Sequence, residues 1–404
     1  MKKQIVFFCA TTPYVMIYKI AREFKKRGYE TVLVTLSQKD KFNQNFFEDA
    51  FDKILCSDFQ FFKPNLKTIP YILQRGPKFL KFLCEIKKIK PYVWFGVGRT
   101  NWPVRVIHKY FFKKYPFIYF EYDINSQMYL SREEARKVMP NFEIDAEKYC
   151  FEHAEGLMHK GDPEEIKHLN NRIFKEIKLP NEIINFLPYC SDEYIVPINK
   201  NKLSKFDKEF HIVYIGGVTN LPESNKIVHK ILKSILNQGI HVHIYGKTQH
   251  ISVKDTYDYI KDNLSEFRKN KYFHLHKGLD PKEIIPEISK YDYGLWFTDL
   301  HTENNPEDTI FCTGNKISSY LEAGIPFIYY DQLKFINKIL KKYSLQFSFN
   351  YKNIDNLKNR IKQMNKRIKD SDLIAAREDF NIKNHFFRLE KFVKNLVEKY
   401  KKFN

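Results

Sequence analysis

The sequence lacks the features that mark a disulfide-rich secreted protein or an integral membrane protein. Its six cysteines include no Cys-x-x-Cys pair, so neither a disulfide framework nor a cysteine zinc site is indicated. No apolar run approaches the roughly 20 residues that a membrane-spanning helix requires. The basic start and the apolar stretch after it are similar to a secretory signal, but Pro13 and an amphipathic segment follow at once, which favours a buried first strand. We therefore expect a protein of the reducing cytoplasm.

The chain also has fewer acidic than basic residues. The chain has 48 Asp and Glu against 68 Lys and Arg, which gives a formal net charge of +20. This excess favours anionic partners such as nucleotides, nucleic acid or acidic lipid, although the residue bias is also typical of an AT-rich genome. No zinc finger, RNA-recognition signature or Gly-flanked basic arm accompanies the charge, so nucleic-acid binding is the less favoured alternative.

The 404 residues fit two domains of about 150–200 residues each. Short apolar runs alternate with helical patterns, first from Gln4–Cys9 onward and again from residues 211–215. Strands that are apolar on both faces and separated by helices are typical of a covered parallel sheet, so we predict an α/β fold with two facing Rossmann-like domains. The predicted parts are an N-terminal domain (1–190), a linker (191–207), a C-terminal domain (208–380) and a C-terminal helix that packs back toward the N-terminal domain (381–404).

A polar turn and a short helical pattern begin at Gly314-Asn315-Lys316. Helix starts leave backbone N–H groups unpaired and carry partial positive charge. We therefore expect this turn to face a phosphate together with the free amides of Ile317 and Ser318. An ordinary corner between a helix and a strand is the alternative interpretation.

Three more turns with glycine follow predicted strands of the second half. They contain Gly216 and Gly217, then Lys247, and then Gly278 and Leu279. Open α/β sheets bind ligands at the carboxyl ends of their parallel strands. The convergence of four such turns favours a ligand site over chance placement.

Residues 315–326 resemble the donor-site signature of GT-B glycosyltransferases, especially the bacterial group 1 enzymes that use nucleotide-diphosphate sugars. That signature consists of a Lys, an apolar residue, Glu-Tyr, another apolar residue and Ala-Gly-x-Pro. This chain matches it with Lys316, Tyr320 and the run Ala323-Gly324-Ile325-Pro326. The likeness covers nearly the whole chain in architecture, but motif agreement is confined to the second domain. Two positions depart from the pattern: Ser319 stands where many relatives have a ribose-binding Glu, and Gly217 where relatives often have Arg. We therefore assign neither a retaining nor an inverting outcome.

The resemblance implies a hexosyltransferase-like, metal-independent enzyme that moves a sugar from a nucleotide-diphosphate donor to a hydroxyl of a surface-glycan or lipid-linked acceptor. Residues 208–380 would bind the nucleotide sugar, residues 1–190 would form the acceptor side, and no cofactor besides the donor substrate is implied. A sugar-nucleotide epimerase of the same fold and a non-catalytic protein that binds nucleic acid or membrane are the alternatives. The implied donor-binding residues are Gly216, Gly217, Lys226, Lys247, Gly278, Leu279, Gly314, Asn315, Lys316, Ile317, Ser318 and Ser319.

Carboxylates at a strand end of the first half are the candidate catalytic residues. Asp123, and after it Glu121, could accept the proton of an attacking hydroxyl if the mechanism is inverting. The alternative is that Asp123 only turns the chain after its strand. Arg99 is the acceptor-side candidate, because its guanidinium could pair with a substrate phosphate. Its turn half-matches the dinucleotide fingerprint, but the third glycine is missing, which disfavours a nicotinamide dehydrogenase.

Two pairs of histidines have a spacing that is compatible with metal binding. His241 and His243, and likewise His274 and His276, lie two residues apart on predicted strands and so share a face. Strands in a covered sheet explain these positions without a metal, and we predict no metal site.

Residues 63–90 carry eight Lys and Arg against the single acid Glu85, with apolar residues between them. Such a segment could lie on an anionic bilayer, or its apolar face could pack on the sheet while its lysines remain solvated. The first alternative predicts a cytoplasmic protein that is peripheral on the inner face of the cell membrane.

Overall fold

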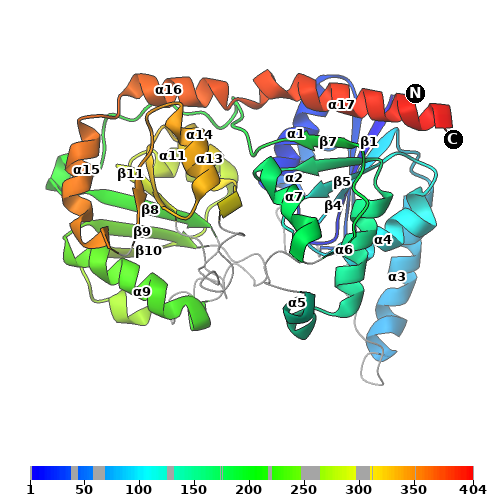
Figure 1. Cartoon of the computed structure of the whole chain (residues 1–404), viewed down its shortest axis with the longest axis horizontal. Helices are drawn as coiled ribbons and strands as arrows, with labels where there is room; N and C mark the ends of the chain where they lie inside the picture. Colours follow the sequence, from blue (N-terminus) through cyan, green and yellow to red (C-terminus); the bar gives the residue numbers. More distant parts are fainter. Residues whose placement is uncertain are drawn as a thin grey trace. The chain divides into compact units, whose positions relative to one another are not determined.

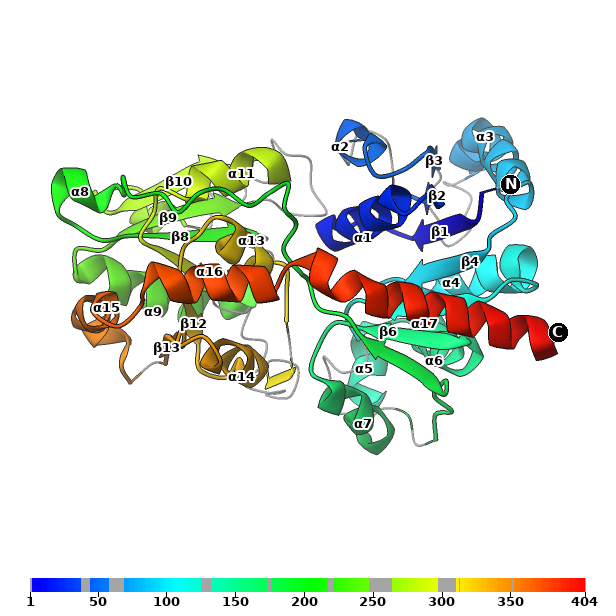
Figure 2. The same ribbon diagram turned by 90° about the horizontal axis from the view of Figure 1, so that it is seen from above.

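The computed structural model describes residues 2–37, 44–57, 69–124, 132–172, 174, 176–216, 221–246, 264–296, 310–311, 313–350 and 352–403. The chain divides into two compact units (Figure 1): Met1–Leu187 with His385–Asn404, and Pro188–Asn384. Residues 191–207, where we predict a linker, fall within the second unit. Most of the C-terminal helix α17 (Ile382–Phe403) belongs to the first unit (Figure 2).

The first unit is a seven-stranded parallel sheet in the order β3-β2-β1-β4-β5-β6-β7. Its strands are β1 Gln4–Cys9, β2 Glu30–Thr35, β3 Lys53–Cys56, β4 Val93–Val97, β5 Phe117–Glu121, β6 Gly156–His159 and β7 Glu182–Asn185. Its helices are α1 Val15–Lys26, α2 Gln44–Glu48, α3 Ile69–Lys87, α4 Asn101–Ile107, α5 Arg132–Val138, α6 Asn141–His153, α7 Pro163–Arg172 and most of α17. The apolar stretch after Met1 is thus a strand inside the sheet, as predicted.

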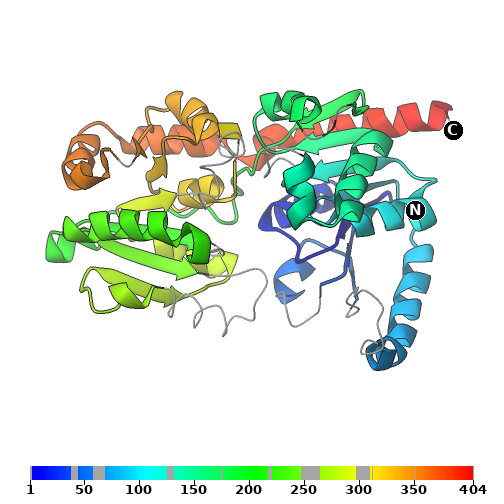
Figure 3. The ribbon, with the colours of Figure 1, turned by 60° about the horizontal axis from the view of Figure 1, so that its bottom comes forward.

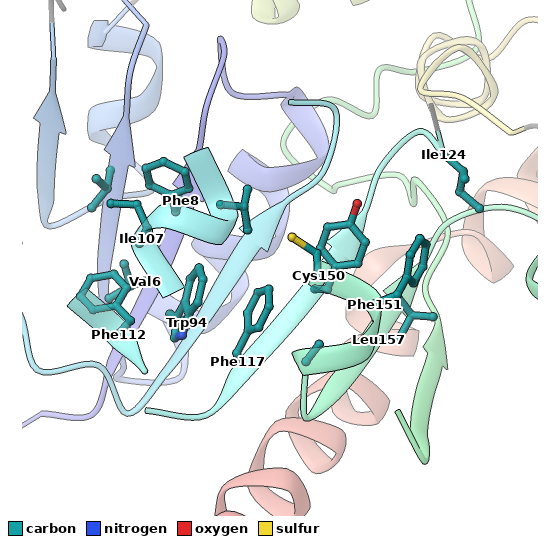
Figure 4. Packing of buried hydrophobic residues seen from close by; sticks show 14 of the residues in the cluster. Val6, Phe8, Trp94, Ile107, Phe112, Phe117, Ile124, Cys150, Phe151 and Leu157 are labelled. Carbon is teal, nitrogen blue, oxygen red and sulfur yellow. The ribbon is translucent and has the colours of Figure 1, made fainter. Parts of the chain in front are cut away.

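Apolar side chains on both faces of this sheet explain why helices cover both. Val6 and Phe8 point into one layer, where they form a core with Trp94 and with residues of α3, α4, α6 and α7 (Figure 4). Phe7 points to the opposite layer, where its ring stacks on Phe95 with the centroids 4.8 Å apart. Alternation along an extended strand places these neighbours on opposite faces.

The second unit is a six-stranded parallel sheet in the order β10-β9-β8-β11-β12-β13. Its strands are β8 His211–Gly216, β9 His241–Gly246, β10 Phe273–Lys277, β11 Tyr293–Trp296, β12 Phe327–Tyr330 and β13 Ser348–Phe349. Its helices are α8 Ser204–Asp207, α9 Leu221–Asn237, α11 Pro281–Ile288, α13 Lys316–Glu322, α14 Lys334–Lys341, α15 Leu357–Asn365 and α16 Asp370–Asp379. Figure 3 shows α9 lying along the β8-β9-β10 part of the sheet, where Ile231 and Ile235 pack on Ile212 and Val242. The predicted α/β fold with two parallel sheets is confirmed.

Among the helices that the structure describes, none is long and apolar enough to cross a membrane.

Candidate functional site

In the second unit, Lys316 lies beside the carboxyl ends of β8 and β11. Its Nζ is 5.1 Å from the centroid of the Tyr214 ring and 5.9 Å from that of Trp296, distances that allow cation–π attraction. Gly216, the last residue of β8, has φ +119°, and a Cβ placed on it would lie 3.2 Å from the same Nζ. Glycine is needed here for the backbone conformation, which side chains rarely adopt. The structure thus brings Gly216 and Lys316, two predicted donor residues, together where parallel sheets bind ligands.

The turn before α13 carries the other predicted donor residues. Asn315 is the N-cap, and its carbonyl accepts the hydroxyl hydrogens of Ser318 at 3.0 Å and Ser319 at 3.1 Å. A Cβ on Gly314 would lie 3.4 Å from the Trp296 ring, so the turn runs close to that indole. Both serine hydroxyls therefore bond back to the helix start in this structure.

The prediction of two free amides at this turn needs a correction. The Ile317 N–H donates to the Gly314 carbonyl at 3.2 Å, because the tight turn already closes a hydrogen bond at this position. The side chain of Ile317 is fully buried in the core. Ile317 therefore holds the helix on the sheet, and its amide is not available to a phosphate.

Tyr320 anchors α13 to the two strands that carry the site. Its hydroxyl donates to the Leu295 carbonyl at 2.7 Å and lies 3.2 Å from the Val213 carbonyl. The ring fills the space over Gly294, where an added Cβ would lie 2.5 Å from it. Tyr320, which matches the tyrosine of the donor-site pattern, thus holds α13 against β8 and β11.

Arg377 of α16 holds the other end of α13. Its Nε donates to the Leu321 carbonyl at 2.9 Å and its Nη1 to the Val196 carbonyl at 3.0 Å. Gly324 follows with φ +65°, and a Cβ there would lie 2.4 Å from Nη2 of Arg377. Sequence reasoning missed this arginine, since nothing in its local pattern marks it as buried.

The remaining predicted donor residues are less well defined. Gly278 and Leu279 follow β10 and are half-buried just before α11, whose start is closed by a capping box of Asp280 and Glu283. Gly217 and Lys247 lie outside the described residues. Lys226 belongs to α9, but its side chain lies outside the described part of the chain.

In the first unit, the predicted residues Arg99 and Asp123 join one cluster after β4 and β5. Asp123 Oδ1 accepts a hydrogen bond from Lys160 Nζ at 2.8 Å, and the same Nζ lies 4.2 Å over the Tyr122 ring. The Tyr14 ring stacks on Tyr122 with the centroids 3.6 Å apart, and Arg99 Nη1 donates to the Tyr14 hydroxyl at 3.3 Å. The strand ends thus present a carboxylate and two cations around an aromatic pair.

Glu121 has a different environment from that of Asp123. Its side chain is 2% exposed, and Oε2 lies 2.6 Å from Nδ1 of His159, the residue opposite it in β6. The other ring nitrogen, Nε2, lies 3.1 Å from the Asp162 carbonyl and 3.2 Å from Oε2 of Glu165. Because both nitrogens face acceptors, His159 is best described as a cation between carboxylates, and Glu121 as its buried partner.

This environment predicts a pH dependence of stability. Burial by itself would lower the pKa of His159, but the hydrogen bonds and charges of Glu121 and Glu165 outweigh it and raise the pKa to about 10. The unfolded chain loses this proton near pH 6.5. The stabilisation is therefore fully present below pH 6.5 and is lost as pH rises toward about 10.

Urea unfolding of the wild type and of His159→Gln at pH 6, 8 and 9.5 checks this dependence. We expect the difference in unfolding free energy between the wild type and His159→Gln to be largest at pH 6 and to decrease at each higher pH. If this difference does not change with pH, His159 is neutral in the folded protein.

The two units, each with a parallel sheet and covering helices, have the GT-B fold. No family model matches the sequence, and no curated protein matches it either. Solved structures do match over nearly the full length. Sucrose-phosphate synthase from Thermosynechococcus elongatus is 11% identical, with a TM-score of 0.69 over 98% of this chain and 100% of that one.

HepE from Anabaena in complex with UDP and glucose is 11% identical, with a TM-score of 0.64 over 97% of this chain and 100% of that one. A UDP-N-acetylglucosamine 2-epimerase is 13% identical, with a TM-score of 0.51 over 94% and 91%. At these identities the likeness establishes the fold, and the activity has to be argued from the site.

Proposed function

We propose that the protein is a glycosyltransferase that moves a sugar from a nucleotide-diphosphate donor to a hydroxyl of a surface-glycan or lipid-linked acceptor. The observation that carries this proposal is the position of Lys316, at the strand ends of the second unit beside Gly216 and Trp296. A lysine ammonium there can neutralise the diphosphate as it leaves, so the proposal requires no metal. The fold match to HepE, a protein solved with UDP and glucose, supports a nucleotide-sugar donor.

For the first unit we propose acceptor binding. Arg99 and Lys160, two cations beside the stacked Tyr14 and Tyr122 rings, would attract an acceptor with a phosphate. Asp123 would accept the proton of the attacking hydroxyl, because its carboxylate is only half-buried and bonds one cation. Glu121 would act indirectly, by holding His159 and the β5 and β6 ends in place.

Product analysis tests this function. The protein is incubated with individual sugar nucleotides, with and without a membrane-lipid and glycan extract, and the nucleotide products are separated by chromatography. A transferase releases nucleoside diphosphate in step with a glycosylated product. Release of neither product with any donor and extract would contradict the proposal.

A sugar-nucleotide epimerase is the second candidate, because one of the matching folds is a UDP-N-acetylglucosamine 2-epimerase. The same incubation separates the two functions. An epimerase converts the donor to an isomeric sugar nucleotide without an acceptor, whereas a transferase consumes the donor only with one or by slow hydrolysis.

Membrane attachment through α3 is a further part of the proposal. The buried face of this helix includes Phe82 and Ile86, while Lys78, Leu80 and Lys81 are exposed, Leu80 by 63%. Basic residues beside an apolar side chain suit an anionic bilayer, at about 1 kcal/mol for each basic residue.

We therefore expect Lys78→Glu with Lys81→Glu to weaken co-sedimentation with phosphatidylglycerol vesicles about tenfold or more. Lys366→Glu with Lys369→Glu, at exposed positions of the second unit, is the control for net charge. If both double variants lose the same amount of vesicle binding, the binding depends on overall charge and not on α3.

A further inference from the structure

Five of the 13 histidines of the chain gather on one face of the second sheet. The parallel register places His211 of β8 beside His241 of β9, and His243 of β9 beside His274 of β10. The rings of these two pairs are stacked, with centroids 4.2 Å and 4.3 Å apart. His276 lies two residues after His274 and continues the same row, as the two-residue period of a strand requires.

The ring nitrogens of this row face one another. His211 Nδ1 is 3.0 Å from His243 Nε2, and one nitrogen from each of His211, His241 and His243 lies within 4.8 Å of the others. The side chain of Asp207 adds an oxygen, with Oδ2 2.8 Å from His211 Nε2 and 3.5 Å from His241 Nε2. His211 and His243 are each only 6% exposed, so the three imidazoles gather at a largely buried point, with the 41% exposed Asp207 carboxylate beside it.

We propose that His211, His241 and His243 form a binding site for a divalent transition metal of the Zn²⁺ type. Neutral imidazole is a ligand that zinc, copper, nickel and cobalt accept readily, whereas magnesium and calcium prefer oxygen. His211 Nδ1 and His243 Nε2, which already face each other, would be two ligand atoms, and His241 would offer Nε2, because its Nδ1 faces His274. Two zinc–nitrogen bonds of about 2.0–2.1 Å at a tetrahedral angle span about 3.3 Å, close to the 3.0 Å that now separates His211 Nδ1 from His243 Nε2. The metal would take the place of the proton between them, after small rotations of the stacked rings.

The second nitrogen of each ligand already has a partner. His274 Nε2 lies 2.8 Å from His241 Nδ1, and His276 Nε2 lies 3.0 Å from His243 Nδ1. Asp207 contacts the Nε2 of His211 in the same way. Histidines that bind metals are oriented by such contacts, which fix the tautomer and turn the free nitrogen toward the ion.

The site is positioned for a structural role. His211 is the first residue of β8 and His241 the first of β9, whereas Gly216, beside Lys316, is the last residue of β8. The metal would therefore tie neighbouring strands together at their amino ends, away from the proposed donor site. Asp207 is 41% exposed, which leaves a route for the ion and for a water as fourth ligand.

Metal titration of the tag-free full-length protein tests the inference. After treatment with EDTA and dialysis, we expect one equivalent of Co²⁺ to produce a visible absorption band typical of tetrahedral coordination. We expect Zn²⁺ to displace it, with an affinity measured against a chromophoric chelator. We also expect Zn²⁺ to raise the unfolding temperature, because it binds the folded state.

His241→Gln is the main variant, since this histidine is the most exposed of the three ligands. It should weaken Zn²⁺ binding more than tenfold, while His229→Gln, which alters a histidine of α9 paired with Glu266, should leave binding unchanged. Asp207→Asn should weaken binding about tenfold and serves as the decisive variant if His241→Gln fails to fold in EDTA. Absence of saturable binding in the wild type, or equal affinities in Asp207→Asn, His241→Gln and His229→Gln, would overturn the proposal.

Discussion

Replacing Lys316 with alanine is expected to remove the stabilisation that a nucleotide diphosphate gives the wild-type protein. The ammonium lies beside Gly216, Tyr214 and Trp296, and a charge-assisted bond to a phosphate is worth about 1.5–3 kcal/mol. The dissociation constant should therefore rise by about ten- to a hundredfold. If the ammonium acts mainly on the departing diphosphate, kcat should fall by a larger factor still.

The matched control is Lys334→Ala, because Lys334 is an exposed lysine at the start of α14 in the same unit. Calorimetric titration with the same nucleotide measures both variants. Unchanged affinity in Lys316→Ala would show that the second unit binds its ligand elsewhere or binds no nucleotide.

Replacing Arg377 with alanine is expected to destabilise the second unit by about 3 kcal/mol. The change removes charge-assisted hydrogen bonds to the carbonyls of Leu321 and Val196, of which the Leu321 carbonyl keeps the Gly324 N–H as a donor at 3.0 Å. It also opens a cavity against Gly324. Because α13 carries Lys316, nucleotide affinity should fall as well.

Urea unfolding followed by circular dichroism measures this loss, with the exposed Arg268→Ala as the control for removing a positive charge. Arg377→Lys should recover only part of the stability, because one ammonium cannot reach carbonyls on two segments. A loss no larger than that of Arg268→Ala would show that the carbonyls find other donors and that α13 needs no such support.

The fold could be predicted from the sequence because its strands are short, apolar and regularly spaced. The stretches that begin at Gln4 and His211 are apolar on both faces, which only a sheet covered by helices tolerates, and both are inner strands of parallel sheets. What local pattern does not reveal is long-range anchoring. Arg377 reaches α13 from a helix more than 50 positions later, and nothing in its sequence neighbourhood indicates this contact.

The site could be predicted only in part, for a similar reason. Glycine at a strand end, followed much later by a lysine at a helix start, indicated Gly216 and Lys316, and the structure places them together. The Ile317 amide was wrongly expected to be free, because a turn closes hydrogen bonds that a residue pattern does not show. Lys160 was missed beside Asp123, and His211 beside His241, since each pair forms only when separate strands align.

The measurement that tests the central claim most directly is the thermal unfolding of the wild-type protein with millimolar UDP, GDP, CDP and ADP and with their sugar conjugates. A ligand at about 100 times its Kd should add roughly 2.7 kcal/mol to the free energy of unfolding. We predict that one nucleotide family raises the unfolding temperature, with the sugar conjugate and the free diphosphate both effective. If no nucleotide stabilises the protein while anionic lipid or an oligonucleotide binds it, the glycosyltransferase proposal is wrong and a binding role takes its place.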